Sequence, residues 1–273
     1  MLKKNYLFIG LILCCNFCIA QQDRIKVAGE IYYNVSHLYD TTSGSRFNET
    51  AILYYGQQGS LFRSYDAMIG EEKFKKYRAE GSIGPNPGMG RGSRDLYFTF
   101  QAVKQIQRVR NFLDGITMNT YLMPEPIEKI QWKIFPETKN IGSYNCQKAL
   151  GICKGREYIA WFCADIPYNA GPWKLQGLPG LILEAVDSKN HVSFKFNRIE
   201  TNAVSKDFID PLPSFIKVKE IDFEKMRQAY YENPPANGVS GIIKNAQGEI
   251  VKPKIPYMNN PMDLISKLPK LFI

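Results

Sequence analysis

The chain has 273 residues, of which 44% are hydrophobic and 13% aromatic, and its formal net charge is +9. This composition predicts one sizeable domain, because a chain of about 250 residues can bury a core without the help of disulfides. A small scaffold that depends on disulfides for its stability is therefore excluded.

The N-terminal residues have the features of a secretory signal peptide. Two lysines precede a short apolar run and a small-residue exit, so we expect cleavage between Ala20 and Gln21. Residues 1–20 are then the signal peptide, and residues 21–273 form a single exported domain that is periplasmic, surface-located or secreted. No later stretch approaches the roughly 20 apolar residues of a transmembrane helix.

The exported chain stays basic. Cleavage removes two lysines and no acidic residue, so the net charge falls from +9 to +7. Clusters at Lys73–Arg78 and Lys104–Arg110 are interleaved with apolar residues. This pattern fits the solvated face of strands or of a short helix, and alternatively a basic patch for an anionic glycan or envelope surface. Export argues against nucleic acid as a partner.

Aromatic-rich runs recur along the exported chain, each bounded by Gly, Pro, Asn or Asp, and they predict a mainly β fold. Hardly any helix separates the runs, which excludes a doubly wound fold. We expect one strongly curved antiparallel sheet, a bowl or half-barrel, with hairpin turns at Lys154-Gly155 and at residues 188–190. The predicted strands are residues 25–39, 46–57, 59–66, 95–101, 105–112, 116–123, 130–136, 143–152, 157–163, 179–187 and 191–200.

One short helix is predicted late in the chain, at Phe223–Glu232, with Asp222 as its N-cap and a proline pair as its stop. The glycine-rich segment Gly81–Ser93 lacks the spacing of a phosphate-binding loop, so we expect a long irregular loop there. The Pro- and Asn-rich residues 234–273 promise little regular structure.

Few residues offer recognisable catalytic chemistry. The only histidines are His37 and His191, and neither has the spacing of a multi-histidine metal site, so we expect neither a metal nor a cofactor. No nucleophile elbow is present, and Cys163 lacks a neighbouring motif that would activate it. Carboxylates are plentiful, which leaves a paired-acid mechanism open without singling out a pair.

The stretch from Asp165 to Asp187, "DIPYNAGPWKLQGLPGLILEAVD", raises the question of whether it forms a site or a corner. Pro167 marks a strand exit, and the Pro-Gly pair favours a type II turn with a positive φ at the glycine. We expect foremost a structural corner that leads into a strand. Its six motif residues are Gly177, Leu178, Pro179, Gly180, Leu181 and Ile182.

Glu184 follows the corner and alternates with aliphatic residues along the predicted strand. A buried carboxylate needs a partner, because an unpaired buried charge is costly. We expect Glu184 either to pair with a cation, with Arg156 and Lys174 as candidates, or to contact a ligand in a concave pocket.

Aromatic residues gather near the corner in the sequence. Trp161, Tyr168 and Trp173, flanked by Asp165 and Lys174, would form a sugar-binding platform if they were exposed. If they were buried, the same residues would plug the open end of the sheet. Both alternatives fit the sequence.

Three cysteines remain after signal cleavage, which allows one intramolecular disulfide at most. A two-residue turn at Lys154-Gly155 fixes a hairpin register in which Cys146 lies opposite Cys163. In this register the two cysteines form a non-hydrogen-bonded pair, whose Cα atoms are about 4.5 Å apart. That distance lies within the range that a disulfide accepts. We therefore predict a Cys146–Cys163 disulfide and a free thiol at Cys153.

The chain resembles the GLPGLI family, which is named for the motif at Gly177–Ile182. The resemblance also covers Trp132, Glu137–Ala149, Gly155–Phe162 and Asn259–Leu264. It implies an exported protein of Bacteroidota without an assigned activity. More distantly, the chain resembles the N-terminal bowl-like domain of secreted peptide:N-glycosidases, which implies a curved antiparallel sheet that assists glycoprotein engagement.

Three functional hypotheses follow. The first is a non-enzymatic exported protein whose concave face binds a glycan, a peptide or another envelope component. The second is a hydrolase that acts on glycoproteins, and the third is a purely structural accessory of the cell surface. Exposed Trp rows would favour the binding protein, clustered carboxylates in a cleft the enzyme, and a filled bowl the structural accessory.

Overall fold

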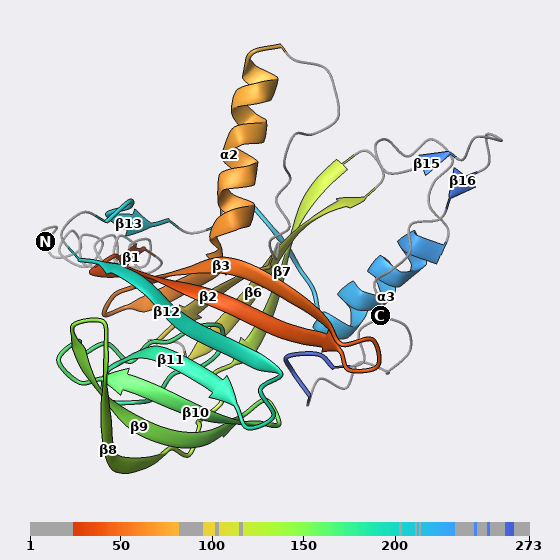
Figure 1. Ribbon diagram of the computed structural model, residues 1–273. Helices are drawn as coiled ribbons and strands as arrows, with labels where there is room; N and C mark the ends of the chain where they lie inside the picture. Colours follow the sequence, from red (N-terminus) through yellow and green to blue (C-terminus); the bar gives the residue numbers. More distant parts are fainter. Residues whose placement is uncertain are drawn as a thin grey trace, which may run out of the picture.

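The computed structural model describes residues 24–81, 95–101, 104–114, 117–201, 204–210, 212, 214–232, 243–244, 250–251 and 260–264. Within this part of the chain the fold is mainly β, as predicted, with two helices and one large sheet (Figure 1). The predicted signal peptide, its cleavage site and almost all of the glycine-rich loop lie outside the described residues.

The large sheet has twelve strands in the order β14-β7-β6-β5-β4-β3-β2-β12-β11-β10-β9-β8. All neighbours are antiparallel except β14 and β7, which are parallel, so the sheet is mixed. It is not closed, because β14 and β8 form two separate edges. The bounds are β2 (Gly29–Asp40), β3 (Ser45–Tyr55), β4 (Gly59–Ser64), β5 (Asp95–Phe100), β6 (Gln105–Asp114), β7 (Thr117–Pro126), β8 (Lys133–Ile141), β9 (Tyr144–Cys153), β10 (Arg156–Cys163), β11 (Leu181–Asp187), β12 (Val192–Glu200) and β14 (Ile216–Lys217).

Two small sheets accompany the large one. β1 (Ile25–Lys26) pairs with β13 (Phe208–Ile209), and β15 (Ile243–Lys244) pairs with β16 (Ile250–Val251). The second of these is a short regular element within a region where the sequence promised little.

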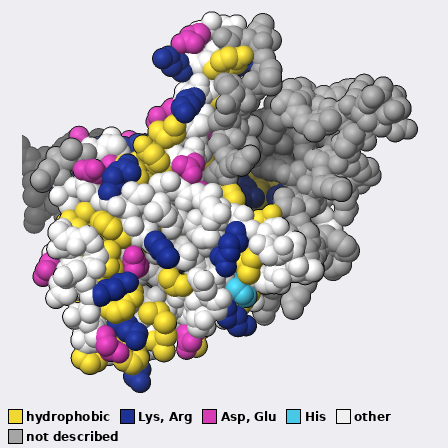
Figure 2. All heavy atoms as spheres, viewed as in Figure 1, with side chains coloured by type: hydrophobic (Ala, Val, Ile, Leu, Met, Phe, Trp, Pro, Cys, Tyr) yellow, Lys and Arg dark blue, Asp and Glu magenta, His cyan; other side chains and the backbone are white. Residues whose placement is uncertain are grey.

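The large sheet is curved, so that β8 to β11 turn below β2, β3 and β12 (Figure 1). Along β2 the side chains alternate: Tyr33 and Val35 are buried on the inner face, whereas Asn34 is exposed on the outer face. The main hydrophobic core fills the inner face between the two parts of the sheet. Figure 2 shows the side of the molecule seen in Figure 1, with a mostly polar surface and a few basic side chains over β2, β3 and β12, and a mixture of apolar, basic and acidic side chains over β8 to β11.

The hairpin of β9 and β10 has the predicted turn and register. Lys154 and Gly155 both have positive φ, +49° and +77°, as a two-residue hairpin turn requires. Arg156 pairs with Cys153, and the ladder continues in step to Phe162 and Gln147. The register therefore matches the sequence prediction at every pair from Arg156 and Cys153 to Phe162 and Gln147.

The structure holds Cys146, Cys153 and Cys163 as free thiols, so the Cys146–Cys163 disulfide is not formed in it and stays a prediction. The β9–β10 ladder stops one pair short of these residues, and β10 has a bulge against β11 between Trp161 and Phe162. The Cys146 and Cys163 side chains nevertheless lie within hydrogen-bonding reach of each other, as the predicted register requires. Burial raises the pKa of the Cys146 and Cys153 thiols to about 12, which leaves them protonated and unreactive at neutral pH.

A helix, α2 (Tyr65–Ala79), follows β4 and corrects the prediction of a single helix late in the chain. Its N-cap is Ser64, whose hydroxyl accepts a hydrogen bond from the Ala67 amide at 3.1 Å. Only Ala67 and Gly70 are buried along it, so the sequence has no continuous apolar stripe to reveal the helix. The basic cluster Lys73–Arg78 belongs to this helix, which was one of the predicted alternatives.

The predicted late helix is confirmed as α3 (Glu220–Glu232), which begins three residues earlier than expected. Asp222 therefore lies in its first turn and is not its N-cap. Phe223 anchors the helix: it is 1% exposed and packs on Tyr121 with ring centroids 5.3 Å apart. Neither this helix nor any other in the described part of the chain is long and apolar enough to cross a bilayer.

Candidate functional site

Both glycines of the corner at Gly177–Ile182 have a positive φ, +158° at Gly180, and Gly180 in addition has no room for a side chain. Gly177 has φ +96°, in a region that favours glycine. Gly180 lies against β10, where a Cβ atom would be 2.2 Å from the Cys163 carbonyl oxygen. The Gly180 amide donates to the Leu178 carbonyl at 2.8 Å, which closes a γ-turn around Pro179. The predicted type II turn is wrong, because this three-residue turn forms in its place.

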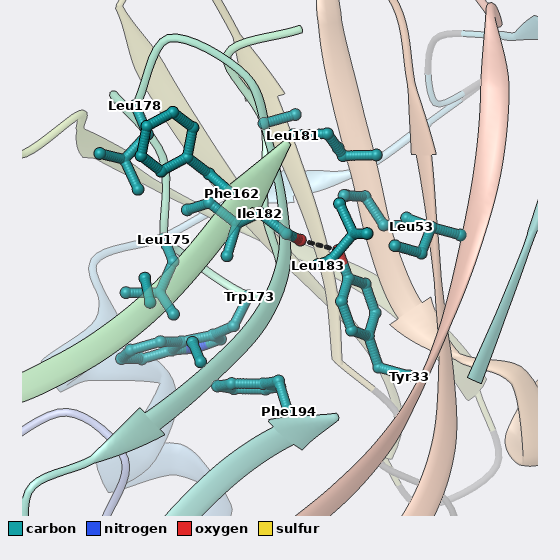
Figure 3. Close-up of a cluster of buried hydrophobic side chains, with 14 of the residues drawn as sticks. Tyr33, Leu53, Phe162, Trp173, Leu175, Leu178, Leu181, Ile182, Leu183 and Phe194 are labelled. Atoms are coloured by element: carbon teal, nitrogen blue, oxygen red, sulfur yellow. Dashed lines mark hydrogen bonds between the residues drawn. The ribbon is translucent and has the colours of Figure 1, made fainter. Parts of the chain in front are cut away.

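The apolar residues of the corner belong to the core. Leu178, Leu181 and Ile182 are at most 1% exposed. The Tyr33 hydroxyl donates to the Ile182 carbonyl at 2.6 Å and ties the corner to β2 (Figure 3). The Ile182 amide in turn donates to the Ala170 carbonyl at 3.0 Å. These side chains are therefore unavailable to a ligand in this structure.

The aromatic residues that precede the corner fill the inner face. Trp173 is 3% exposed, has φ +57° and packs within the cluster drawn in Figure 3. Tyr168 lies against Tyr55 with ring centroids 5.0 Å apart. Lys174 is buried as well, and its ammonium group pairs with Glu125. This arrangement corresponds to the plug and not to an exposed platform.

Asp165 and Trp161 do not lie with these residues on the inner face. Asp165 is exposed in the turn after β10. Trp161 is half-buried on the outer face of β10, directly across from Glu184 on β11. The six residues proposed from the sequence as ligand contacts therefore do not converge on one site: Trp161 and Glu184 share the outer face, whereas Trp173 and Lys174 are buried on the inner face.

Glu184 pairs with a cation that the sequence did not indicate. The Lys139 ammonium group lies 2.6 Å from a Glu184 carboxylate oxygen and 4.5 Å from the centre of the Trp161 ring. Both proposed partners are engaged elsewhere, Arg156 with Asp187 and Lys174 with Glu125. Lys139 comes from the edge strand β8, so the three side chains form one cluster across β8, β10 and β11.

A row of outer-face residues extends from this cluster across the sheet. On β12, Lys195 lies opposite Glu184. This position follows from the register, in which Ala185 pairs with Phe194 and Val186 with Ser193. Lys195 pairs with Asn34 on β2, and Asn34 pairs with Thr50 on β3. Paired residues of antiparallel strands share a face. We call Trp161, Glu184, Lys195, Asn34 and Thr50 the outer row.

The outer row leads into a shallow groove with a volume of about 510 Å³. Amide, hydroxyl and charged side chains dominate its lining, unlike the aliphatic inner face. Asn34, Arg46, Asn48 and Lys195 are all exposed there. The lining residues are Asn34, Val35, Ser36, Arg46, Asn48, Glu49, Thr50, Asp66, Asn190, Ser193 and Lys195.

The groove residues are held by local hydrogen bonds. The Arg46 guanidinium donates to the Asn190 carbonyl at 2.8 Å and to the Ser36 hydroxyl at 3.4 Å. Asp66, in the first turn of α2, accepts from the Thr50 amide at 2.8 Å. Helix α2 therefore forms one boundary of the groove. Sequence reasoning missed this site because its residues come from β2, β3, β12 and α2, which meet only in the folded chain.

The buried titratable groups serve the fold in this structure. Burial lowers the pKa of His37 to about 4, so its ring is neutral at physiological pH. Burial alone would raise the pKa of Asp95, but Arg108 and Arg110 lower it to about 2. Within the described ranges, no group of three or more His, Cys, Asp or Glu side chains is placed to hold a metal ion.

Comparison with known proteins adds a family match to these observations. Residues 150–184 match the model of the Porph_ging family, described as a protein of unknown function. The match covers the end of β9, all of β10, the corner and the start of β11. A search of curated proteins gives no match.

Two solved structures of PNGF-II resemble the chain, one in the P21 and one in the C2 space group. Their TM-scores are 0.47 and 0.46, both at 15% sequence identity. They cover 75% and 72% of this chain, which spans about a third of each of theirs, 33% and 32%.

Proposed function

We propose that the protein is a non-enzymatic exported binding protein of the cell envelope, and that it holds a polar, extended ligand, a glycan or a peptide, on the outer face of its sheet. The observation that carries the proposal is the outer row. It places an aromatic ring, a carboxylate, an ammonium group, an amide and a hydroxyl side by side across five strands.

The chemistry of the row suits such a ligand. Asn34, Lys195 and Thr50 offer hydrogen-bond donors and acceptors for sugar hydroxyls or peptide groups. Trp161 offers an apolar ring at the other end of the row. Neighbouring strands are about 4.8 Å apart, so the row extends over roughly 19 Å from β10 to β3. That length matches several sugar or peptide units better than one small molecule.

The filled inner face directs the proposal to the outer face. Trp173, Leu175 and Leu178 occupy the concavity in which the sequence analysis placed a ligand, and each is at most 3% exposed. The groove beside α2, in contrast, is open and polar. The basic start and small-residue exit of residues 1–20 support the exported location.

The test is a glycan and peptide array probed with the protein that begins at Gln21. The double variant Asn34→Ala/Lys195→Ala removes two exposed groove side chains without disturbing the core. The matched control Asn140→Ala/Lys129→Ala removes the same two side-chain types at exposed positions outside the groove. We expect specific array signals that the groove variant loses and the control keeps. The absence of any specific signal, or equal signals from both variants, would contradict the proposal.

A further inference from the structure

Residues 260–264, Asn-Pro-Met-Asp-Leu, lie against the ends of two hairpins that are distant in sequence. We call this segment the strap. It contacts the end of β2 and the turn between β9 and β10, more than 100 residues before it in the chain. Asn260 is 7% exposed, whereas Leu264 is 49% exposed. The strap therefore begins in a buried position and ends at the surface.

Arg156 donates hydrogen bonds to three successive residues of the strap. Its Nη2 atom donates to the Asn260 side-chain oxygen and to the Pro261 carbonyl, both at 2.5 Å. Its Nε atom donates to the Met262 carbonyl at 3.1 Å. A guanidinium has five donors in a fixed plane, so this contact requires a side-chain acceptor at the position of Asn260 and the backbone path that follows it.

Residues at the end of β2 form hydrogen bonds with Asn260 as well. The Asn260 amide nitrogen of the backbone donates to the Tyr39 carbonyl at 3.1 Å, and its side-chain nitrogen donates to the Leu38 carbonyl. The Asn260 carbonyl lies 2.7 Å from Nε2 of His37. Because a carbonyl only accepts, neutral His37 carries its proton on Nε2. All the polar groups of Asn260 are thus engaged, and no other side chain presents this set of donors and acceptors in the same space.

Two further contacts fix the second half of the strap. A carboxylate oxygen of Asp263 lies 3.4 Å from the Lys174 ammonium group. The Leu264 amide donates to the Lys154 carbonyl at 2.9 Å, next to the hairpin turn. The contacts therefore specify an asparagine and, three residues later, an acidic residue.

The groups that hold the strap keep partners of their own without it. Arg156 pairs with Asp187 at 2.8 Å, and both side chains are at most 3% exposed. Lys174 pairs with Glu125 from β7. Neither cation depends on the strap for its neutralisation, so the recognising surface is held in shape by the body of the domain.

We propose that this surface is a peptide-binding site, specific for an Asn-Pro-Met-Asp-Leu type of motif, which the strap occupies in the isolated chain. A peptide of the same chemistry from another polypeptide binds there in exchange for the strap. The strap has the advantage of being tethered, so a free peptide competes with a high effective local concentration. Weakening the strap exposes the site to the peptide.

The test uses the full chain and a fluorescently labelled peptide with the sequence of residues 259–265, Asn-Asn-Pro-Met-Asp-Leu-Ile. Fluorescence anisotropy measures its binding to the wild type, to the strap variant Asn260→Ala/Asp263→Ala and to the control Asn145→Ala/Glu157→Ala. The control removes an exposed asparagine and an exposed carboxylate from β9 and β10. Circular dichroism establishes that each variant is folded.

We expect the strap variant to bind the peptide roughly tenfold more tightly than the wild type or the control, because its own segment competes less. Two altered peptides, with alanine in place of the asparagine that corresponds to Asn260 or of the aspartate that corresponds to Asp263, test specificity without any risk to the fold. We expect each to bind roughly tenfold more weakly. Equal binding of the peptide by the folded strap variant and the wild type, or equal binding of all three peptides, would overturn the proposal.

Discussion

Substitution of Gly180 by alanine tests the physical account of the corner. A Cβ atom at this position would lie 2.2 Å from the Cys163 carbonyl oxygen, 2.7 Å from its carbon and 3.0 Å from the Ala164 Cα atom. All three are backbone atoms, so no side-chain rotation relieves the clash. The β10 backbone, the corner or both must move, and both belong to the core.

The expected cost follows from that geometry. Forcing extra atoms into a packed core typically costs 1–3 kcal/mol, and the upper end applies here because backbone must shift, so we expect about 3 kcal/mol. For a domain of this size, that loss lowers the melting temperature by roughly 6 to 12 °C. Thermal unfolding followed by circular dichroism measures it.

Gly180 also has a positive φ, +158°, and two other glycines measure that backbone effect without the clash. Gly44→Ala, at φ +71° with nothing within 4 Å, isolates the backbone effect, and Gly177→Ala, at φ +96°, is similar, with its nearest neighbour at 3.5 Å. We expect about 1 kcal/mol for each, or roughly 2 to 4 °C. If Gly180→Ala melts together with these two variants, or with the wild type, the close approach to β10 does not explain the second glycine of the motif.

Three further predictions concern burial, the core and export. Tyr33→Phe leaves the Ile182 carbonyl without its buried donor, and guanidinium unfolding should show a loss of about 2 kcal/mol, whereas an unchanged midpoint would contradict the role of this hydrogen bond. The pKa of His37 is about 4 in the folded protein, against 6.5 for a free histidine. As the pH drops, the unfolded chain therefore binds the proton first. The free energy of unfolding should fall between pH 6.5 and pH 4, by roughly 3 kcal/mol at most. His37→Gln should remove that part of the pH dependence, and an identical pH profile for both proteins would refute the assignment. Intact mass of the exported protein should correspond to a chain that begins at Gln21, and a product that retains Lys3 would exclude the predicted cleavage.

The predictions that the structure confirms depended on local sequence signals, such as hairpin turns and the alternation of apolar residues. The turn at Lys154-Gly155 fixed the β9–β10 register pair by pair, because a two-residue turn leaves no freedom in the pairing. The hairpin of β11 and β12 was equally clear, with Asn190 at φ +54° in its turn. The apolar alternation after the corner correctly placed Glu184 and Leu183 on different faces, and only Leu183 is buried.

The failed predictions depended on information that is not local. Helix α2 has no apolar stripe, because it packs through only Ala67 and Gly70, so its periodicity gave no signal. The Pro-Gly pair favours a type II turn in isolation, but in the fold Gly180 lies close against β10 and a γ-turn forms. The β9–β10 ladder ends one pair before Cys146 and Cys163, whose thiols still lie beside each other, so the disulfide stays a prediction.

Neither candidate site could be assembled from the sequence. The outer row depends on the pairing of β12 with β2, which joins Lys195 to Asn34 across more than 150 residues. The strap depends on Arg156 and His37, which are brought to Asn260 from two different hairpins. Periodicity identifies a face of a strand, but it does not identify the neighbouring strand.

The most direct test of the central claim, that the outer face binds the ligand, is isothermal titration calorimetry with the strongest array ligand. The wild type, the groove variant Asn34→Ala/Lys195→Ala and the control Asn140→Ala/Lys129→Ala are titrated in parallel. The proposal predicts a dissociation constant roughly tenfold higher or more for the groove variant, because an amide and an ammonium contact are lost, and an unchanged value for the control. Equal dissociation constants for all three proteins would show that the ligand binds elsewhere and would contradict the proposal.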